Sequence, residues 1–520
     1  MPKKIEKQLE NKPIVLVVID GFGLTNKKIG NAPKSAKMPN YRLYSRTYPT
    51  TKLRADGDAV GLPDYEVGNS EAGHQTIGAG RPIMSDKLII NKAINDGSFY
   101  KNTALKQAAE HAKKNKSTLH LMGLLTNSQS AHASIHHILS LVDLMQKLKV
   151  KDIALHIFTD GRDTNPYHAI KLLNELESKL PKYVKIATVM GRFYAMDRNH
   201  NWDRAKLAYD ALVHGIGTKA NSATEAIEHA YSRGESDEFV KPTVIKNDHH
   251  PLHIKERDAV VFWNLRSDRA RQLAKPFISR HFNGKNGTGF TRGKKIPDLL
   301  FVTLTEFGKQ LDHAISAFTH HEISDTLVEA LRTKKQIYIA ESEKYAHVTY
   351  FFNGGYDSPR FGEYRKRIQS HHVKTFDQVP GMRAKEIALA VAASVNKGYD
   401  FVCTNIANPD MVAHTGNFSA TVKACEAVDV ALGVIVDAVQ KADGICIITA
   451  DHGNAEEVIE KNGSSDTHHN ANPVPFILIG KSVKNKRLSR GTLADIAPTI
   501  LNLMGVPIPK SMTGKNLVRN

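Results

Sequence analysis

The sequence predicts an α/β protein that contains parallel β-sheets and more than one domain. Short β-rich runs alternate along the chain with helix-like segments, a pattern typical of strands joined by crossover helices. With 520 residues, of which 41% are hydrophobic, the chain can bury more than one core. A chain of this length is expected to form about two to four domains.

Seven apolar runs have the length and the β-branched content of buried strands. Between them, amphipathic segments at 134–149 and 385–397 have the spacing of helices. The strand-like runs are IVLVVID (14–20), TLHLMGLL (118–125), DIALHIFTD (152–160), VKIATVMG (184–191), AVVFWNLR (259–266), YDFVCTNIA (399–407) and GICIITAD (444–451).

The sequence favours a cytoplasmic protein with no membrane partner. No run of eighteen apolar residues occurs, and the segment MPKKIEKQLENKP lacks the apolar core of a signal peptide. The three cysteines, Cys403, Cys425 and Cys446, are isolated from one another, and two of them lie in strand-like runs. They are predicted to be buried, reduced thiols rather than a disulfide framework or a zinc site.

The chain carries 71 Lys and Arg residues against 53 Asp and Glu residues, a formal net charge of +18. Short pieces such as KNKRLSR and RGKKIP contain the excess, and no zinc finger, RNP-type segment or long basic arm accompanies them. A scattered surplus of this kind is typical of a solvated surface that also attracts anionic ligands. We therefore predict no nucleic-acid partner.

Acidic and histidine residues follow three of the strand-like runs, and a fourth segment, DTHHNANPVP, adds a histidine pair. Taken singly, each of these residues is more typical of a turn, a helix cap or a loop. Together they offer carboxylates and imidazoles at positions where open α/β sheets bind ligands, and this set suits Mn²⁺, Zn²⁺ or Mg²⁺. The candidate ligands are Asp20, Asp410, His414, Asp451, His452 and His469.

Ser70 lies in EVGNSEAGH, residues 66–74, where Gly68 and Gly73 favour a tight turn. The spacing is one residue too long for the G-x-S-x-G nucleophile elbow, and by itself the segment is typical of a solvated loop. A divalent metal would change this interpretation, because coordination lowers the pKa of a hydroxyl group without a neighbouring base. Ser70 is therefore a candidate nucleophile, and paired ions would align a phosphoryl group beside it.

A set of arginines lies between the first candidate ligand and the later ones. Arginine binds carboxylate and phosphate groups in a planar, bidentate manner, although a single arginine is more often part of a surface ion pair. Several arginines just after apolar runs indicate a pocket for a small, doubly anionic substrate. The arginines of this set are Arg162, Arg192, Arg198, Arg266 and Arg269, and Asp163 lies beside the first of them.

Ten motifs follow one another along nearly the whole chain: DGFG, EVGNSEAGH, GRDT, GRFYAMDR, NLRSDRARQL, EKYAHVTYFFNGG, NPDMVAHTG, TADHGNAE, NPVPF and LADIAPTILNLMGVPIPKSMTGK. In this set and order the sequence resembles the cofactor-independent (2,3-bisphosphoglycerate-independent) phosphoglycerate mutases of the alkaline phosphatase superfamily. The resemblance implies a discontinuous, alkaline-phosphatase-like metal domain made of residues 1–84 and 314–520. It further implies an inserted α/β transferase domain, residues 85–313, that binds the substrate.

The resemblance also implies a role for each candidate residue. Ser70 matches the nucleophile that becomes phosphoserine, and Lys344 matches a residue that neutralises the transferring phosphoryl group. One Mn²⁺ is expected on Asp410, His414 and His469, and a second on Asp20, Ser70, Asp451 and His452. The substrate-binding positions are His132, Arg162, Asp163, Arg192, Arg198, Arg266, Arg269 and Lys344.

One segment departs from the family pattern. Where the family reads close to G-G-V-H-S-H-I-x-H, this chain reads SQSAHASIHH from Ser128 to His137. A one-residue shift in the alignment matches His132 to the family's substrate-binding histidine. We therefore expect a loop of different shape at 128–137.

The implied reaction interconverts 3-phosphoglycerate and 2-phosphoglycerate through a phosphoserine, in a monomer that excludes water by domain closure. His132 and Asp163 are candidates for positioning hydroxyl groups or for moving their protons. Two alternatives use the same core: a metal-dependent phosphatase and a sugar-phosphate mutase. The central arginines suit a substrate with a carboxylate better than a neutral sugar. A basic nucleic-acid-binding module, which needs no metal, is the third class.

Overall fold

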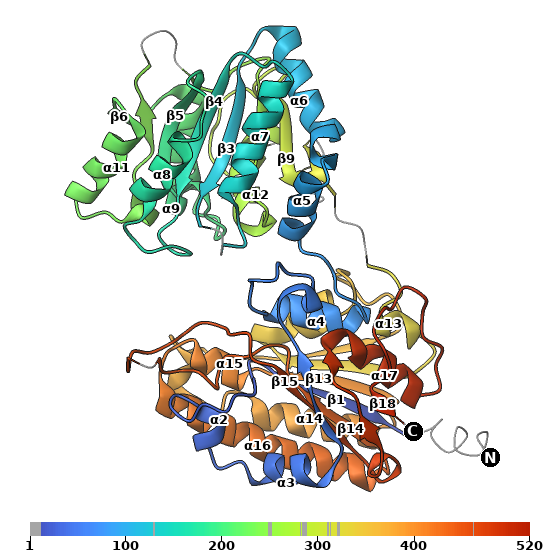
Figure 1. Ribbon diagram of the computed structural model, residues 1–520. Helices are drawn as coiled ribbons and strands as arrows, with labels where there is room; N and C mark the ends of the chain where they lie inside the picture. Colours follow the sequence, from blue (N-terminus) through green and yellow to red (C-terminus); the bar gives the residue numbers. More distant parts are fainter. Residues whose placement is uncertain are drawn as a thin grey trace. The chain divides into compact units, whose positions relative to one another are not determined.

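The computed structural model describes residues 12–127, 130–247, 252–280, 282, 289–308, 311, 314–319, 323–460 and 462–519. The chain forms two compact units, each with its own hydrophobic core. Unit 1 consists of Met1–Ser85 and Glu322–Asn520, and unit 2 consists of Asp86–His321. Figure 1 shows that both chain ends belong to the same unit, so unit 2 is an insertion.

Unit 1 is built on an eight-stranded sheet in the order β12-β11-β13-β1-β14-β15-β2-β17. The strands from β12 to β14 are parallel neighbours, whereas β15 runs antiparallel to β14 and β2. Their bounds are β1 Ile14–Ile19, β2 Thr50–Arg54, β11 Gln336–Glu341, β12 Tyr364–Ile368, β13 Phe401–Ile406, β14 Ile445–Thr449, β15 Val474–Ile479 and β17 Gly491–Thr492. A separate pair joins β16 (Arg487–Leu488) to β18 (Val518–Arg519).

The helices of unit 1 cover this sheet. The long helices α14 and α16 lie side by side against it, and α4, α13 and α17 pack against one another elsewhere (Figure 1). The bounds are α2 Ala32–Ser35, α3 Pro39–Thr47, α4 Ser70–Ala79, α13 Leu327–Ala330, α14 Ala384–Asn396, α15 Asn408–Ala413, α16 Phe418–Lys441 and α17 Ile496–Leu503.

Unit 2 contains a second eight-stranded sheet, in the order β10-β9-β8-β3-β4-β5-β7-β6. The strands from β10 to β5 are parallel, and β3 and β4 are buried along their whole length, as expected for strands covered on both faces. The bounds are β3 Leu119–Leu125, β4 Ile153–Thr159, β5 Val184–Gly191, β6 Thr218–Ala220, β7 Thr243–Ile245, β8 Ala259–Phe262, β9 Leu300–Thr305 and β10 Ile315–Phe318.

Eight α-helices lie in the described part of unit 2. Most are amphipathic and bury one face: the buried residues of α7, for example, recur three and four positions apart. The bounds are α5 Asp86–Asn95, α6 Thr103–Asn115, α7 Ile135–Lys147, α8 Ala169–Glu177, α9 Arg192–Ala195, α10 Trp202–Tyr209, α11 Ala223–Ser232 and α12 Ser267–Ile278.

The predicted α/β class is confirmed, and each of the seven strand-like runs contains a strand. The largest difference between a run and its strand is at 259–266, because β8 ends at Phe262 and not at Arg266. The side chain of Asn264 explains the early end. Its Oδ1 accepts a hydrogen bond from the backbone N–H of Leu124 in β3 at 2.8 Å, in place of the next backbone pair of the ladder.

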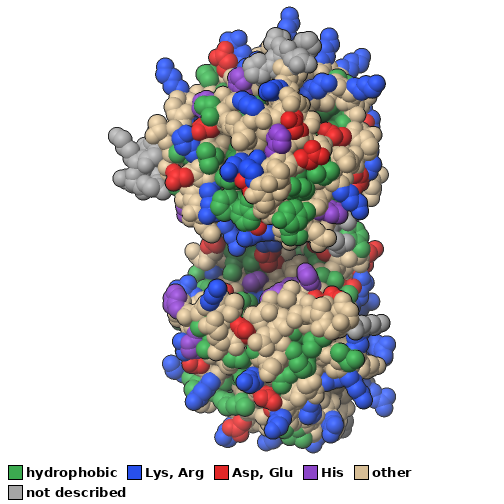
Figure 2. Space-filling view, turned by 90° about the vertical axis from the view of Figure 1, so that its left-hand side faces the viewer, with side chains coloured by type: hydrophobic (Ala, Val, Ile, Leu, Met, Phe, Trp, Pro, Cys, Tyr) green, Lys and Arg blue, Asp and Glu red, His purple; other side chains and the backbone are tan. Residues whose placement is uncertain are grey.

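Three further sequence expectations concern the cysteines, the membrane and the surface charge. All three cysteines are buried and free, as predicted. Across the described ranges, no helix is long and apolar enough to cross a membrane. Lys and Arg side chains are scattered among acidic and apolar ones on the visible face of each unit (Figure 2).

Candidate metal centre and substrate site

Side chains from separate segments of unit 1 converge at the carboxyl ends of three adjacent strands. Asp20 follows β1 directly, Asp451 and His452 come just after β14, and Asp410 lies in α15, which begins just after β13. Because β13, β1 and β14 are parallel neighbours, their carboxyl ends meet at one edge of the sheet. All four side chains are buried, so the polar residues after these strands form an interior cluster.

Ser70 is the first residue of α4, and the side chain of Asn69 caps that helix. The hydroxyl Oγ of Ser70 lies 3.1 Å from Asp20 Oδ1 and 2.9 Å from His452 Nε2. Lys344 Nζ donates a hydrogen bond to the same oxygen at 2.7 Å. The segment that by itself resembles a solvated loop thus places a buried hydroxyl among charged groups.

Lys344 ends the short helix η7 (Ser342–Lys344) that follows β11, and its ammonium group is buried in the cluster. Nζ donates to Asp20 Oδ1 and to Asp410 Oδ2, each at 2.7 Å. Burial alone would lower the pKa of Lys344, but the two carboxylates outweigh it and raise that pKa. Burial likewise opposes ionisation of Asp20 and Asp410, and Lys344 holds both carboxyl pKa values below their ordinary range.

His414 and His469 direct their Nε2 atoms at one carboxylate oxygen. Nδ1 of His414 bonds to the carbonyl of Thr467 at 2.8 Å, and Nδ1 of His469 bonds to the carbonyl of Gly68 at 3.0 Å. A carbonyl only accepts, so each Nδ1 carries a proton, and in the neutral form of each ring the lone pair lies at Nε2. These two Nε2 atoms are 3.1 Å apart, and each lies 3.3 Å from Asp410 Oδ1. Three acceptors that converge in this way fit a cation.

The charge of the cluster also fits divalent metal ions. Three buried carboxylates, Asp20, Asp410 and Asp451, surround one lysine, and uncompensated buried charge is costly. Asp451 Oδ2 is buried and lies near two imidazole nitrogens, Nδ1 of His74 at 3.2 Å and Nε2 of His452 at 3.5 Å. His452 responds to the same negative charge: burial lowers its pKa, but Asp451 and Asp20 raise it to about 9.

The ligand atoms form two groups within this cluster, each with atoms less than 4.8 Å apart. One group contains Asp410, His452 and His469, and its rings at 452 and 469 stack with centroids 3.9 Å apart. The other contains Asp20, Asp451 and His74. His74 was not predicted as a site residue, although it lies in the same motif as Ser70. The division of ligands between two ions stays a prediction.

Unit 2 brings its predicted residues together in a similar way. Arg162 and Asp163 follow β4, Arg192 follows β5, and Arg266 caps α12 after β8. These strands are parallel, so the residues that follow them gather at one edge of the second sheet.

A hydrogen-bonded network fixes part of this edge. Nη1 of Arg192 lies 2.6 Å from Asp160 Oδ1 and 3.2 Å from Asp163 Oδ1, and the arginine is almost completely buried. Ser130 Oγ donates to Asp163 Oδ2 at 2.5 Å and accepts from the backbone N–H of His132 at 3.1 Å. The network therefore positions the Arg192 guanidinium, Asp163 and the backbone of His132.

The positive charges of this edge repel one another. Burial lowers the pKa of Arg269, and Arg198, Arg192 and Arg162 lower it further. The pKa of His132 is also lowered, to about 4, mainly by burial and to a smaller extent by the charge of Arg192. The imidazole is therefore neutral at pH 7. Its Nδ1 is buried without a hydrogen-bond partner among the described residues. An edge of this kind is stabilised by an anion.

Comparisons with known proteins identify the family. The model for the BPG-independent PGAM N-terminus matches residues 90–309. A 2,3-bisphosphoglycerate-independent phosphoglycerate mutase of Clostridium acetobutylicum is 45% identical over 516 residues, covering 98% of this chain and 100% of the relative. The enzyme of that name from Desulforudis audaxviator is 43% identical over 515 residues, covering 98% and 99%. The chain belongs to the family of 2,3-bisphosphoglycerate-independent phosphoglycerate mutases.

A solved phosphoglycerate mutase has the same fold. The structure of the Leishmania mexicana enzyme at low cobalt concentration matches with a TM-score of 0.78 and 28% sequence identity. The match covers 99% of this chain and 98% of that one. The prediction was an α/β fold in which a discontinuous unit carries a second unit as an insertion. The Leishmania mexicana phosphoglycerate mutase shares this fold.

The segment that departs from the family pattern is described in part. Ser128 and Gln129 lie outside the described residues. On either side of them, Asn127 Oδ1 accepts a hydrogen bond from the backbone N–H of Ser130 at 3.2 Å. His132 itself lies beside Arg192 and Asp163, where the one-residue shift predicts a substrate-binding histidine.

Several residues that hold this phosphoglycerate mutase site were missed by sequence reasoning. Asn454 Nδ2 donates to Asp410 Oδ1 at 2.7 Å, and Asn405 Nδ2 donates to Asp20 Oδ2 at 2.6 Å. Asp160 binds Arg192, as described above. Asn454 lies inside the motif TADHGNAE and Asp160 directly precedes GRDT, so both positions carried a usable signal. Asn405 lies inside a strand, where its residue type gives no sign of the contact.

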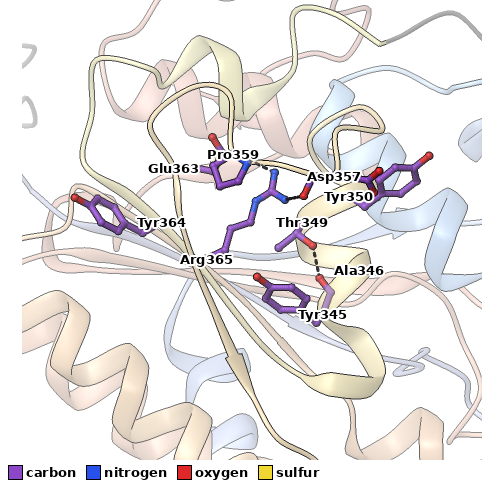
Figure 3. A pocket seen from close by; sticks show the side chains of 9 residues that line it. All are labelled: Tyr345, Ala346, Thr349, Tyr350, Asp357, Pro359, Glu363, Tyr364 and Arg365. Atoms are coloured by element: carbon purple, nitrogen blue, oxygen red, sulfur yellow. Dashed lines mark hydrogen bonds and ion pairs between the residues drawn. The ribbon is translucent and has the colours of Figure 1, made fainter. Parts of the chain in front are cut away.

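Unit 1 also contains a separate pocket of about 510 Å³ that none of the predicted site residues lines. Figure 3 shows its walls, where Arg365 extends between Glu363 and the backbone of Asp357. The lining residues are Tyr345, Ala346, Thr349, Tyr350, Asp357, Pro359, Glu363, Tyr364 and Arg365. Arg365 pairs with Glu363 at 2.7 Å, so these two buried charges in the wall of the pocket compensate each other.

Glu341, at the end of β11 before Lys344, is expected to make stability depend on pH. Burial raises its pKa from 4.5 to about 7, and one carboxyl oxygen is buried without a partner among the described residues. A raised pKa in the folded state stabilises the protein below about pH 4.5, and this contribution is lost as pH rises through about 7. Glu341→Gln should therefore raise the melting temperature at pH 8 by about 2–4 °C and change it little at pH 4.5. Equal shifts at both pH values would contradict this prediction.

Proposed function

We propose that the protein interconverts 3-phosphoglycerate and 2-phosphoglycerate through a phosphoserine at Ser70, independently of 2,3-bisphosphoglycerate. This makes it an intramolecular phosphotransferase of glycolysis and gluconeogenesis. The observation that carries the proposal is the buried Ser70 Oγ within 2.7 to 3.1 Å of Lys344, His452 and Asp20. The family of the chain supports the same reaction, since its relatives carry that enzyme name.

In this scheme Ser70 Oγ attacks the phosphorus of 3-phosphoglycerate. The bond between phosphorus and the C3 oxygen breaks, and that oxygen takes a proton to give glycerate. The Lys344 ammonium donates to Ser70 Oγ at 2.7 Å, where it stabilises the negative charge of the transferring group. The 2-hydroxyl of the glycerate then attacks the phosphoserine and regenerates Ser70.

The residues of unit 2 retain the glycerate between the two transfers. The guanidinium groups suit its carboxylate, and their mutual repulsion favours binding of an anion. With a pKa of about 4, His132 is unprotonated at pH 7 and can accept a proton from a glycerate hydroxyl. Asp163 is the second candidate for this proton transfer. The substrate-binding set we propose is His132, Arg162, Asp163, Arg192, Arg198, Arg266, Arg269 and Lys344.

Two divalent metal ions, most suitably Mn²⁺ for a mixed Asp and His set, lower the pKa of the Ser70 hydroxyl when bound and neutralise the phosphoryl group. We propose that Asp410, His414 and His469 hold one ion and that Asp20, Ser70, Asp451 and His452 hold the other. The converging Nε2 atoms and the burial of all three carboxylates support these assignments.

Product analysis tests this function. The full-length protein, loaded with Mn²⁺, is given 3-phosphoglycerate without 2,3-bisphosphoglycerate, and the products are followed by ³¹P NMR. We expect 2-phosphoglycerate to appear up to its equilibrium level with little inorganic phosphate. Release of inorganic phosphate alone would identify a phosphatase and overturn the proposal. Turnover of sugar phosphates but not of phosphoglycerate would do so as well.

Removal of metal is expected to abolish the reaction and to destabilise unit 1. Lys344 and a protonated His452 would then balance the three buried carboxylates only in part, so the melting temperature should fall in chelator and recover on addition of Mn²⁺. Differential scanning fluorimetry and activity in EDTA-treated and Mn²⁺-restored samples measure both effects. Full activity in protein shown by elemental analysis to be free of metal would contradict the assignment.

We also propose that the protein works as a cytoplasmic monomer on this small-molecule substrate. Sedimentation equilibrium of the active protein tests the monomer, and a dimer mass at working concentrations would refute it.

A further inference from the structure

His74 lies one helical turn after Ser70 in α4 and is completely buried behind the metal-type cluster. Its Nδ1 is 2.9 Å from the backbone carbonyl of Ser70 and 3.2 Å from Asp451 Oδ2. Its Nε2 is 3.1 Å from Nδ2 of Asn405 in β13. Both ring nitrogens therefore have neighbours within hydrogen-bond distance.

These contacts determine where the proton of His74 lies. The Ser70 carbonyl only accepts a hydrogen bond, so Nδ1 of His74 carries the proton and faces both that carbonyl and Asp451 Oδ2. Nε2 is then the acceptor of the ring, and an Asn405 N–H donates to it. A protonated Nδ1 has no lone pair for a metal ion, and the lone pair of Nε2 is already engaged.

Asn405 uses its two amide hydrogens on two different partners. One is donated to Asp20 Oδ2 at 2.6 Å, and the other is directed at His74 Nε2. The amide must be in this orientation, because both partners are acceptors. Asn405 thus joins Asp20, which follows β1, to His74 on α4, and His74 in turn contacts Ser70 and Asp451.

We propose that His74 is a positioning residue and not a metal ligand, although its ring lies among ligand atoms. Together with Asn405 it fixes the backbone of Ser70 and the carboxylates of Asp20 and Asp451, three groups that come from different segments. Such outer partners orient the residues that bind a metal, and their loss typically weakens metal affinity about 10-fold to 100-fold. The inference rests on the proposed dimetal function and deepens it.

Two amide variants separate positioning from ligation. Asparagine places an N–H near the position of Nδ1, so His74→Asn keeps the donor to Ser70 and Asp451. Glutamine places its amide near the position of Nε2, so His74→Gln keeps a partner for Asn405 and loses that donor. We expect His74→Gln to weaken Mn²⁺ affinity about 10-fold to 100-fold and His74→Asn to weaken it less. Both variants should hold as many ions as the wild type at saturating Mn²⁺.

The measurements are Mn²⁺ titration followed by electron paramagnetic resonance, and elemental analysis of full-length protein. Circular dichroism in chelator establishes that each variant is folded. Asn405→Leu, which removes both donors, should also weaken affinity. His156→Gln changes a buried histidine of unit 2 and should leave Mn²⁺ affinity unchanged.

Three results would overturn the inference. Loss of one ion by both His74 variants would make His74 a ligand, and wild-type affinity in both would remove its positioning role. Equal weakening in both without loss of an ion would show that the Nδ1 donor is not what matters. A wild-type protein that binds no divalent ion would instead overturn the proposed function.

Discussion

Replacing Ser70 by alanine is expected to lower kcat by at least about 10⁴-fold, because the covalent step then has no nucleophile. The fold should remain, since the change removes one oxygen from the first residue of α4 and leaves the Asn69 cap in place. Steady-state turnover of 3-phosphoglycerate measures the loss. Mass spectrometry after an acid quench should find a phosphorylated peptide at Ser70 in the wild type and none in the variant.

A matched control separates this effect from the loss of a buried serine. Ser394 on α14 is also buried in unit 1, and its hydroxyl bonds to the carbonyl of Ala390 at 2.8 Å. Ser394→Ala should keep nearly full activity. If Ser70→Ala retained substantial turnover, a covalent phosphoserine could not be on the reaction path.

Replacing Lys344 by methionine is expected to lower kcat/KM by about 10²–10³-fold, the cost of removing one donor to a developing charge. Nζ makes three contacts of 2.7 Å, to Ser70, Asp20 and Asp410, and methionine has a similar length but no charge. The variant should also lose more thermal stability in chelator than in Mn²⁺, because only bound metal would then compensate the carboxylates. Steady-state kinetics and melting curves with and without Mn²⁺ measure both effects.

Lys366→Met on the exposed side of β12 is the control for a lost positive charge, and it should change neither quantity. Near-normal kcat/KM in Lys344→Met would exclude the proposed role of the ammonium group. An equal fall of the melting temperature with and without Mn²⁺ would show that Lys344 does not balance the metal-binding carboxylates.

The elements of the fold were largely predictable from the sequence, because buried parallel strands consist of continuous apolar runs. The run IVLVVID corresponds to β1, and the helices predicted at 134–149 and 385–397 correspond to α7 and α14. The end of β8 was not predictable, because a side chain 140 positions along the chain, Asn264, takes over the bond to Leu124. Only the folded sheet brings these two residues together.

The residues of the candidate site were likewise predictable only in part. Ser70, Asp20 and Asp410 were identified because reactive residue types follow turns and strand ends in recognisable motifs. His74 and Asn405 were not, since their importance lies in which hydrogen each donates and to which partner. The predicted ligand residues gather in unit 1, where His452 groups with Asp410 and His469, and the division of ligands between two ions stays a prediction.

The sequence by itself determined the fold class, the family and the residue types of the site, because these depend on patterns along one chain. Only the tertiary structure decided that Lys344 lies against Asp20 and Asp410, that two imidazoles direct Nε2 at one carboxylate oxygen, and that His74 holds its proton on Nδ1. Charge balance and proton positions depend on distances between segments that lie up to hundreds of residues apart in the sequence. Those distances are set by packing.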